Sequence, residues 1–175
     1  MSASEPPPPD LPPETLRSVD LVMMGAGRFK ATNRRGGVLP IGSGDDPDFT
    51  PVELLLAALA GCGAIDLELV TGKRAPFEDF LARATGHKVR DEQGTHLVQL
   101  SVTLDVTFPA GEGGDQARAV VPRTLQQIED RLCTVGRTVS LGEHVTYTSG
   151  PLAATRVHED ADAADPTSSV GSLPT

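Results

Sequence analysis

The longest hydrophobic stretch of the sequence is a run of twelve uncharged residues, Leu54 to Ile65. Thr50, Pro51 and Glu53 precede it, and this order is typical of a helix start with a capping box. We therefore expect a helix over residues 50–70 that stops near Gly72. It is apolar on every face and is expected to be buried, while the apolar run of about 18 Å is too short for a membrane core of about 30 Å.

Shorter runs of alternating hydrophobic and polar residues predict β-strands. Turn sequences separate the first three, GAG at 25–27 and RRGG at 34–37, and DEQG at 91–94 predicts another hairpin turn before the longest strand. Residues 80–90 alternate only loosely, whereas the longest strand keeps Leu100, Val102 and Leu104 on one face, as in a half-buried antiparallel strand. The predicted strands are 18–24, 28–33, 38–41, 96–108 and 144–148.

A second helical region is expected from Asp115 to Leu132, kinked or split at Pro122. The segment from Cys133 to Gly142 has glycine breakers and is read as more loop-like. The order of strands, buried helix, strands, broken helix and last strand predicts an α+β fold on an antiparallel sheet.

The middle of the hydrophobic run has an unusual composition. Cys62 lies between Gly61 and Gly63, and each glycine inside a helix costs about 1 kcal/mol relative to alanine. A close helix crossing or access to the sulfur would account for them. Small residues three or four apart also form a smooth stripe that suits close packing by another backbone; they are Ala57, Ala60, Gly61 and Ala64.

The two ends differ from the middle in composition. Residues 1–16 hold six prolines and carry a charge of −3, and residues 151–175 are rich in small and polar residues and also carry −3. Both are expected to be disordered, leaving one folded domain at 17–150. Subtracting these charges from the total of −9 leaves −3 for the domain, which argues against nucleic acid as a partner. With no signal peptide pattern and no long apolar segment, the chain is expected to be cytoplasmic.

The two cysteines, Cys62 and Cys133, are 71 residues apart. In a cytosolic protein they are either two buried structural thiols or a redox pair, rather than a permanent disulfide. Within an apolar helix, Cys62 would need a cation from elsewhere in the fold to be reactive. The four histidines and two cysteines show no metal-ligand spacing, and no cofactor motif is present, so we expect neither a metal nor a cofactor.

Two segments of the sequence resemble the OsmC/Ohr family of thiol-dependent peroxidases. The first is PVELLLAALAGCGAID, from Pro51 to Asp66, and the second is CTVGRTV, from Cys133 to Val139. The likeness covers roughly residues 18–149. It implies an OsmC-like fold in which an antiparallel sheet wraps around a buried central helix, in an intertwined homodimer with two active sites at its interface.

The resemblance also implies roles for four residues. Cys62 would attack an organic hydroperoxide, and Cys133 would resolve the resulting sulfenic acid before a dithiol reductant restores both thiols. Arg28 matches the activating arginine best, and Glu53 is the acidic residue available to hold it. Glu53 follows the helix-start proline by two residues rather than one, so its role is either this pairing or only the capping box.

The sequence departs from the peroxidase pattern at two places: Val52 stands where the glutamate is usual, and Thr134 where a proline is usual. Both point to a branch with Pro-x-Glu-Leu-Leu. An alternative to the enzyme is therefore a non-catalytic small-ligand-binding or redox-sensing protein of the same fold. A third reading is a structural role with two inert thiols.

Overall fold

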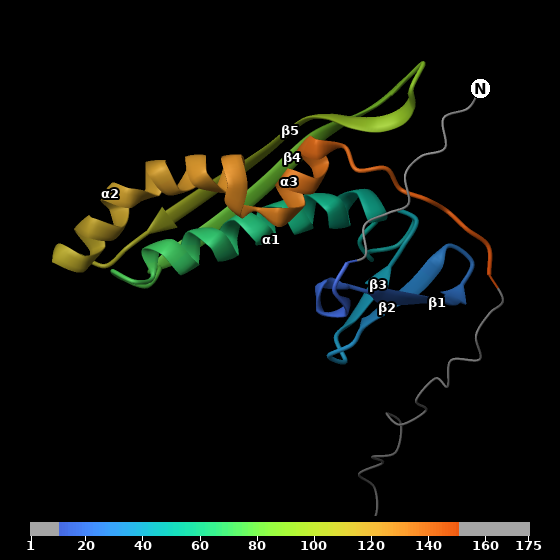
Figure 1. Ribbon diagram of the computed structural model, residues 1–175, viewed down its shortest axis with the longest axis horizontal. Helices are drawn as coiled ribbons and strands as arrows, with labels where there is room; N and C mark the ends of the chain where they lie inside the picture. Colours follow the sequence, from blue (N-terminus) through green and yellow to red (C-terminus); the bar gives the residue numbers. More distant parts are fainter. Residues whose placement is uncertain (1–10, 151–175) are drawn as a thin grey trace, which may run out of the picture. The chain divides into compact units, whose positions relative to one another are not determined.

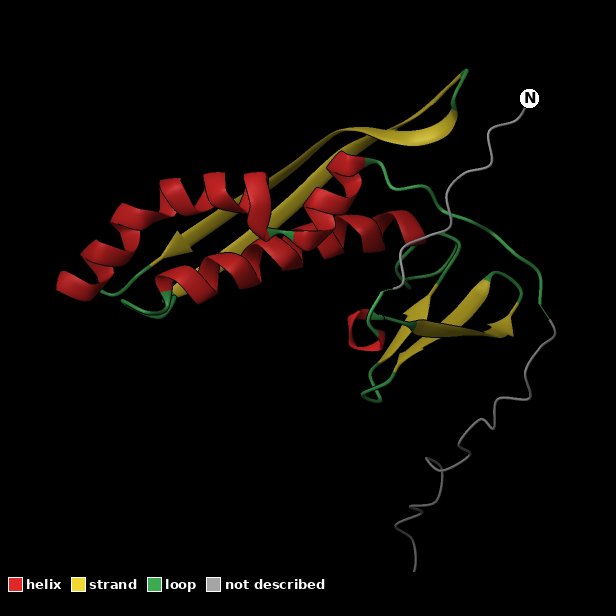
Figure 2. Ribbon diagram, in the orientation of Figure 1, coloured by secondary structure: helices red, strands yellow, loops and turns green. Residues whose placement is uncertain are grey.

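The computed structural model describes residues 11–150. The acidic tail expected at 151–175 and most of the proline-rich leader lie outside the described residues. The described end of the leader contains a short 3-10 turn, Pro13–Thr15. The protein combines helices with antiparallel sheets, as the sequence predicts, but its strands form two sheets rather than one (Figures 1 and 2).

The first sheet has three antiparallel strands in sequence order. They are β1 (Val19–Gly25), β2 (Arg28–Asn33) and β3 (Val38–Ile41). Gly27 in the first turn and Gly36 in the second have φ angles of 69° and 82°, a backbone region that favours glycine. The predicted first three strands and the two turns between them are confirmed.

The central helix α1 spans Pro51–Thr71. Thr50 Oγ1 accepts the Glu53 backbone N–H, Glu53 accepts the Thr50 N–H in return, and Gly72 is the C-cap. The helix and its capping box are thus confirmed. Its buried residues are four apart and form one stripe along the helix: Leu59, Gly63, Leu67 and Thr71.

The rest of α1 is only partly covered by its own chain, so this chain alone does not bury the helix on every face. Ile65 is 59% exposed and Leu69 is 65% exposed. Among the described residues, α1 is also the one helix long and apolar enough, by length and composition, to cross a membrane. Core helices of soluble proteins meet the same criterion, and Asp66 and Glu68 would be costly in hydrocarbon.

The second sheet is a long hairpin of β4 (Asp79–Asp91) and β5 (Gly94–Thr107). Asp91 pairs with Gly94 across the predicted turn, and β5 confirms the strongest strand pattern in the sequence.

This hairpin contains a β-bulge. Thr85 pairs with Ser101 but His87 pairs with Val98, so Gln99 and Leu100 lie opposite the single residue Gly86. Gln99 has φ 52° and is the only non-glycine residue with positive φ in the described chain. A Cβ at Gly86 would lie 2.8 Å from Leu100 Cδ2, so glycine lets the bulged strand approach. Because the bulge adds one residue to β5, the face to which alternate side chains point changes between Leu97 and Leu100.

The C-terminal helical region differs from the sequence prediction. Helix α2 (Glu112–Gln127) continues through Pro122, so the proline does not split it. The interruption comes later, where η2 (Ile128–Leu132) forms a π turn. A further helix, α3 (Thr134–Leu141), replaces the expected loop and ends at Gly142, whose φ is 67°. The sequence does not indicate where α3 starts, because its N-cap is Cys133 and cysteine is not a usual N-cap residue.

A small hydrophobic core joins the far end of the hairpin to α2. Phe108, Ala117 and Ala75 are buried there, with Phe77 packed against them. The Phe77 and Phe108 rings meet edge to face with centroids 5.7 Å apart, a favourable aromatic geometry. This core fixes where α2 begins and therefore the direction in which the chain returns along α1.

The strand predicted at 144–148 is wrong. Residues 144–150 have no regular secondary structure, and no described strand pairs with them. Val145 and Tyr147 are 63% and 92% exposed. An alternating sequence forms a strand only when a neighbour supplies its backbone hydrogen bonds.

Gln99 provides a test of the bulge. A non-glycine residue in the left-handed region costs about 1–2 kcal/mol, so Gln99→Gly is expected to raise the free energy of unfolding by about 0.5–1 kcal/mol after the greater chain entropy of glycine is subtracted. Chemical denaturation would measure it. The control is Thr103→Gly in ordinary strand geometry, expected to lower stability by a similar amount; a Gln99→Gly protein equally destabilised would contradict the bulge.

Candidate functional site

The fold brings the two cysteines together. Cys62 lies in the middle of α1, and Cys133 lies between η2 and α3. Their sulfur atoms and one carboxylate oxygen of Asp66 all lie within 4.8 Å of one another. Cys62 is half-buried, and Cys133 is 6% exposed. Both thiols are free, and a disulfide of about 2.0 Å requires the sulfurs to move closer by side-chain rotation or a small backbone shift.

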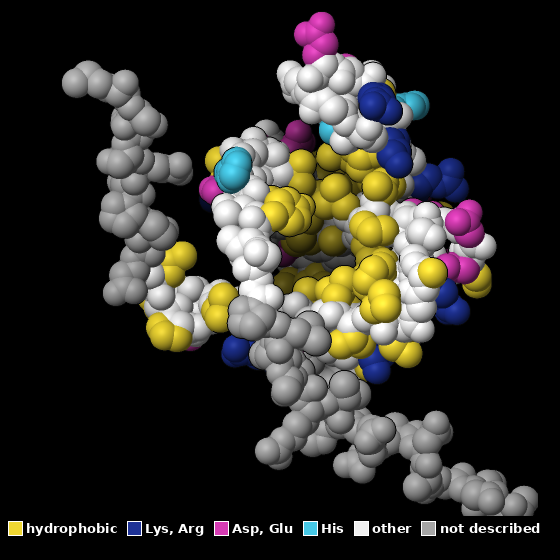
Figure 3. Space-filling view, turned by 90° about the vertical axis from the view of Figure 1, so that its right-hand side faces the viewer, with side chains coloured by type: hydrophobic (Ala, Val, Ile, Leu, Met, Phe, Trp, Pro, Cys, Tyr) yellow, Lys and Arg dark blue, Asp and Glu magenta, His cyan; other side chains and the backbone are white. Residues whose placement is uncertain are grey.

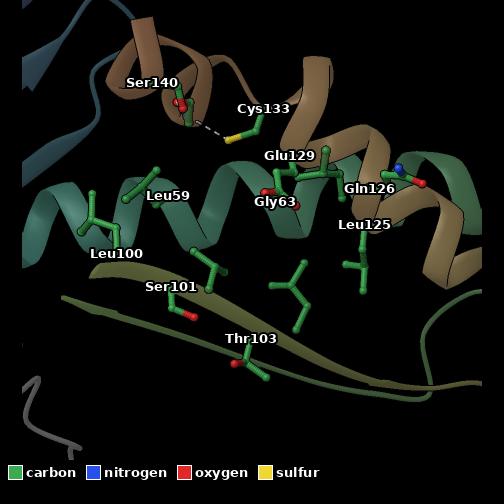
Figure 4. Close-up of a pocket in the computed structure, with 14 residues that line it drawn as sticks. Leu59, Gly63, Leu100, Ser101, Thr103, Leu125, Gln126, Glu129, Cys133 and Ser140 are labelled. Atoms are coloured by element: carbon green, nitrogen blue, oxygen red, sulfur yellow. Dashed lines mark hydrogen bonds between the residues drawn. The ribbon is translucent and has the colours of Figure 1, made fainter. Parts of the chain in front are cut away.

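Cys133 occupies the N-cap position of α3. Its Sγ accepts the backbone N–H of Gly136 at 3.2 Å (Figure 4). Burial raises the pKa of the Cys133 thiol, and the neighbouring Cys62 and the Asp66 charge raise it further, while the Gly136 N–H opposes them. Burial and adjacent negative charge both disfavour a thiolate. Cys133 is therefore held mainly as a thiol at neutral pH.

Asp66 is the member of this cluster that the sequence reasoning did not single out. It follows Cys62 by four residues, so both side chains project from the same face of α1. Asp66 Oδ2 lies 4.0 Å from Cys62 Sγ, the outer limit for a contact involving sulfur. The spacing from Cys62 could have identified Asp66, but only the structure adds Cys133 as the third member.

Arg28, at the start of β2, does not meet the thiols in the described chain. Its guanidinium lies 3.0 Å from Asp48 and 3.8 Å from Asp46, and its side chain is 58% exposed. Both aspartates belong to the loop that precedes α1, where Asp46 also accepts the Asp48 backbone N–H. Among residues 11–150, no ion pair joins Arg28 to Glu53.

Glu53 is engaged in capping α1. Its Oε2 accepts the backbone N–H and the hydroxyl of Thr50, each at 2.8 Å. The backbone hydrogen bond, followed by the hydroxyl, lowers the pKa of the Glu53 carboxyl. Of the two roles open to Glu53, capping is the one made within this chain.

A cavity of about 650 Å³ lies beside the cluster, between the middle of α1, β5 and the segment from α2 to α3. Of the two thiols, Cys133 lines it. Leucine side chains supply much of its wall and Figure 4 shows three of them, Leu59, Leu100 and Leu125, together with the polar residues Ser101, Thr103 and Glu129. The cavity is large enough for a small organic ligand.

Cys62, Asp66 and Cys133 are also the group in the described chain whose atoms are close enough to hold a metal ion. Two sulfurs and one oxygen suit zinc, but a closed structural site takes four protein ligands. The group supplies three, from two half-buried residues and one buried residue. The expectation of no metal and no cofactor stays a prediction.

The sequence matches a known protein family. The sequence model described as OsmC-like protein matches residues 42–148, which include α1, the β4–β5 hairpin and both cysteines. This match spans more than half of the chain. The chain belongs to the OsmC-like protein family. A comparison with curated proteins finds no match.

Solved OsmC-like structures share the fold. An OsmC-like protein of unknown function from Vibrio cholerae O1 biovar eltor aligns with a TM-score of 0.59 and 13% identity, covering 70% of this chain and 92% of that one. An OsmC-like protein from Mycoplasma pneumoniae aligns at 0.57 and 15%, covering 71% and 87%. A hypothetical protein from Aquifex aeolicus VF5 aligns at 0.56 and 16%, covering 74% and 90%. At these identities the likeness concerns the fold alone.

The lowered pKa of Glu53 predicts a pH-dependent contribution to stability. A carboxyl with a lowered folded-state pKa stabilises the fold above its unfolded value, here the ordinary 4.5, and the contribution is lost as pH falls through the folded value. Glu53→Gln keeps the acceptor but removes the titration. The stability difference between the two proteins should therefore be constant above about pH 5.5 and shrink below about pH 4.5. Denaturation from pH 3 to 7 measures it, and a difference independent of pH would contradict the assignment.

Proposed function

We propose that this OsmC-like protein is a thiol-dependent peroxidase that reduces organic hydroperoxides. The observation that carries the proposal is the position of the two sulfurs, which lie within 4.8 Å of each other although the cysteines are 71 residues apart in sequence. Cys62 is assigned the attacking role because it is the more accessible thiol, whereas Cys133 is 6% exposed with a raised pKa.

The proposed reaction has three steps. The Cys62 thiolate attacks the terminal oxygen of R–O–O–H; the O–O bond breaks, R–O⁻ takes up a proton to leave as the alcohol, and Cys62 becomes a sulfenic acid. Cys133 then attacks the Cys62 sulfur, giving a disulfide and water. An external dithiol finally reduces the disulfide by exchange through a mixed disulfide, which leaves both thiols restored and the reductant oxidised.

Arg28 and Glu53 are proposed to support the first step. A cation near Cys62 would stabilise its thiolate, and Arg28 is the candidate implied by the family resemblance. To act there, its guanidinium has to exchange Asp48 and Asp46 for the thiolate. Glu53 would hold Arg28 in that arrangement, at the expense of its hydrogen bonds to Thr50.

A homodimer is proposed because a single chain leaves so much apolar surface uncovered. Figure 3 shows hydrophobic side chains gathered on one face of the molecule. Exposed hydrophobic residues occur in β1, as at Met23 (73%), and along α1, as at Leu69 (65%). Apolar surface on this scale marks an interface. A second copy that covers α1 accounts for this apolar surface better than a membrane does. We also propose a cytoplasmic location, which agrees with two free thiols.

A second candidate function is the binding of a small apolar ligand without chemistry or as a redox sensor. The cavity of about 650 Å³ with leucine walls favours it. The two functions differ in their dependence on Cys62, because a cavity ligand needs no thiol at that position. Removal of all peroxide consumption by Cys62→Ser would reject binding as the main function.

The peroxidase is tested by adding one equivalent of an alkyl hydroperoxide to the reduced protein. Intact mass should fall by two hydrogens, and peptide mapping should find a Cys62–Cys133 bond. Cys62→Ser should lose peroxide reduction, and Cys133→Ser should stop at a sulfenic acid that dimedone traps. An unchanged mass, or overoxidation of both thiols without a bond between them, would reject the proposal.

The dimer is tested by sedimentation equilibrium. The protein should have about twice the chain mass of 18.3 kDa, and Leu69→Glu should dissociate it because a buried unpaired charge is costly. The matched variant Leu69→Ala, which adds no charge, should weaken the dimer far less. A monomeric wild-type protein, or a dimer indifferent to Leu69→Glu, would contradict an interface over α1.

A further inference from the structure

We propose that Asp66 is the acid–base residue of disulfide formation: it takes the proton from the Cys133 thiol and delivers it to the hydroxide that leaves the Cys62 sulfenic acid. The inference rests on the proposed function, because it concerns the second step of that reaction. It assigns a role to a carboxylate that neither the peroxide-cleaving step nor the helix cap uses.

The geometry places one carboxylate within reach of both sulfurs. Helix α1 fixes Asp66 one turn after Cys62, with Oδ2 at 4.0 Å from the Cys62 sulfur. The Cys133 sulfur approaches from the start of α3 and lies within 4.8 Å of the same two atoms. A single group can thus contact the attacking sulfur and the leaving oxygen, as a proton carrier must.

The chemistry of Cys133 creates the need for such a group. Cys133 is buried and mainly protonated, as its raised pKa requires, and a thiol is a poor nucleophile compared with its thiolate. The Gly136 N–H at 3.2 Å can steady the negative charge on the sulfur as the proton departs. Because the Gly136 N–H is itself a donor, it cannot accept the proton from the thiol.

The atoms and electrons of the step balance without another reactant. The Cys133 S–H proton moves to an Asp66 oxygen while the sulfur electron pair forms the S–S bond. The S–O bond of the sulfenic acid breaks with its electron pair on oxygen, and the proton held by Asp66 completes water. Cys133 is oxidised as the Cys62 sulfur is reduced, and Asp66 ends as the carboxylate that it was.

Among the described residues, the cluster and the cavity beside it include one further ionisable side chain, Glu129. From α1 the cluster contains only Cys62 and Asp66, and Glu129 in η2 lines the cavity beside Cys133. The residues of β5 and α3 that line the same cavity carry no charge. Glu129 is thus the competing candidate for the base, and it has to be tested beside Asp66.

The test separates the two steps in time. Reduced protein is mixed with one equivalent of tert-butyl hydroperoxide or, in a parallel series, hydrogen peroxide, and quenched samples are analysed by intact mass with and without dimedone. Asp66→Asn should form the sulfenic acid at least as fast as the wild type, because it removes a negative charge beside the Cys62 sulfur. It should close the disulfide at least about tenfold more slowly, since general acid–base catalysis contributes 10²–10⁴-fold. The dimedone adduct should accumulate accordingly.

Two further readouts distinguish proton transfer from a structural effect. Disulfide closure that needs a base to take the thiol proton should slow at low pH in the wild type, and Asp66→Asn should lose that dependence. Asp66→Glu should recover part of the rate because it restores a carboxylate, whereas Asp66→Ser should not. Glu68→Gln, an exposed site on the same helix, is the control and should close its disulfide at the wild-type rate.

Three outcomes would overturn the inference. Disulfide closure at the wild-type rate in Asp66→Asn leaves the peroxidase intact and rejects only the role of Asp66. Slowing in Glu129→Gln but not in Asp66→Asn transfers the role to Glu129. Absence of a Cys62–Cys133 bond in the wild type with either oxidant rejects the proposed function as well. Circular dichroism checks that each variant is folded. If Asp66→Asn misfolds, the comparison of Asp66→Glu with Asp66→Ser tests the role of the carboxylate instead.

Discussion

The contact between the middle of α1 and the start of α3 is the constraint on which the candidate site depends. At Gly63 the helix has no side chain, and a Cβ there would lie 3.5 Å from Leu104 on β5 and 3.8 Å from Ile128 in η2. Both distances are ordinary van der Waals separations, so the hairpin and the π turn both pack against α1 at that level. This proximity is what holds Cys133 beside Cys62 across 71 residues of sequence.

The π turn at η2 and the helix cap at Cys133 complete that arrangement. The Cys133 backbone N–H bonds to the Ile128 carbonyl, and its sulfur accepts the Gly136 N–H. The thiol is thereby fixed by the backbone on both sides, in a buried position that keeps its pKa raised. The other thiol, Cys62, is half-buried, on a helix that its own chain buries fully along one stripe and partly elsewhere. This difference in exposure suits the proposed roles, in which the accessible thiol reacts with the substrate and the buried thiol reacts afterwards with the oxidised sulfur.

Local features of the fold could be predicted from sequence. The capping box at Thr50 and Glu53, the first three strands and their glycine turns, and the β5 alternation depend on neighbouring residues, so their patterns are readable. Tertiary contacts decide two other features, so the sequence does not predict them. One is the start of α3, which has a cysteine N-cap, and the other is the absence of a strand at 144–148, where no strand of the described chain pairs with it. Pro122 was misleading because a proline inside a helix does not always end it, and here the π turn after Gln127 does.

The candidate site was predictable in part. Cys62 and Cys133 were named from motifs, and the structure brings them together, whereas the contacts of Arg28 with Asp46 and Asp48 had no signal in the sequence. Asp66 illustrates the limit. Its four-residue spacing from Cys62 can be seen in the sequence, but its place in a cluster depends on Cys133, which lies in a distant segment of the chain. Only the three-dimensional arrangement converts a common i,i+4 pair into a three-atom cluster.

The central claim is that Cys62 and Cys133 of one chain form a single redox couple. Equilibrating the protein in a series of dithiol–disulfide buffers and counting free thiols at each potential tests it most directly, without any peroxide. We expect both thiols to disappear together in one two-electron transition, with the disulfide inside one chain. Independent loss of the two thiols, or a bond that links two chains, would contradict the account.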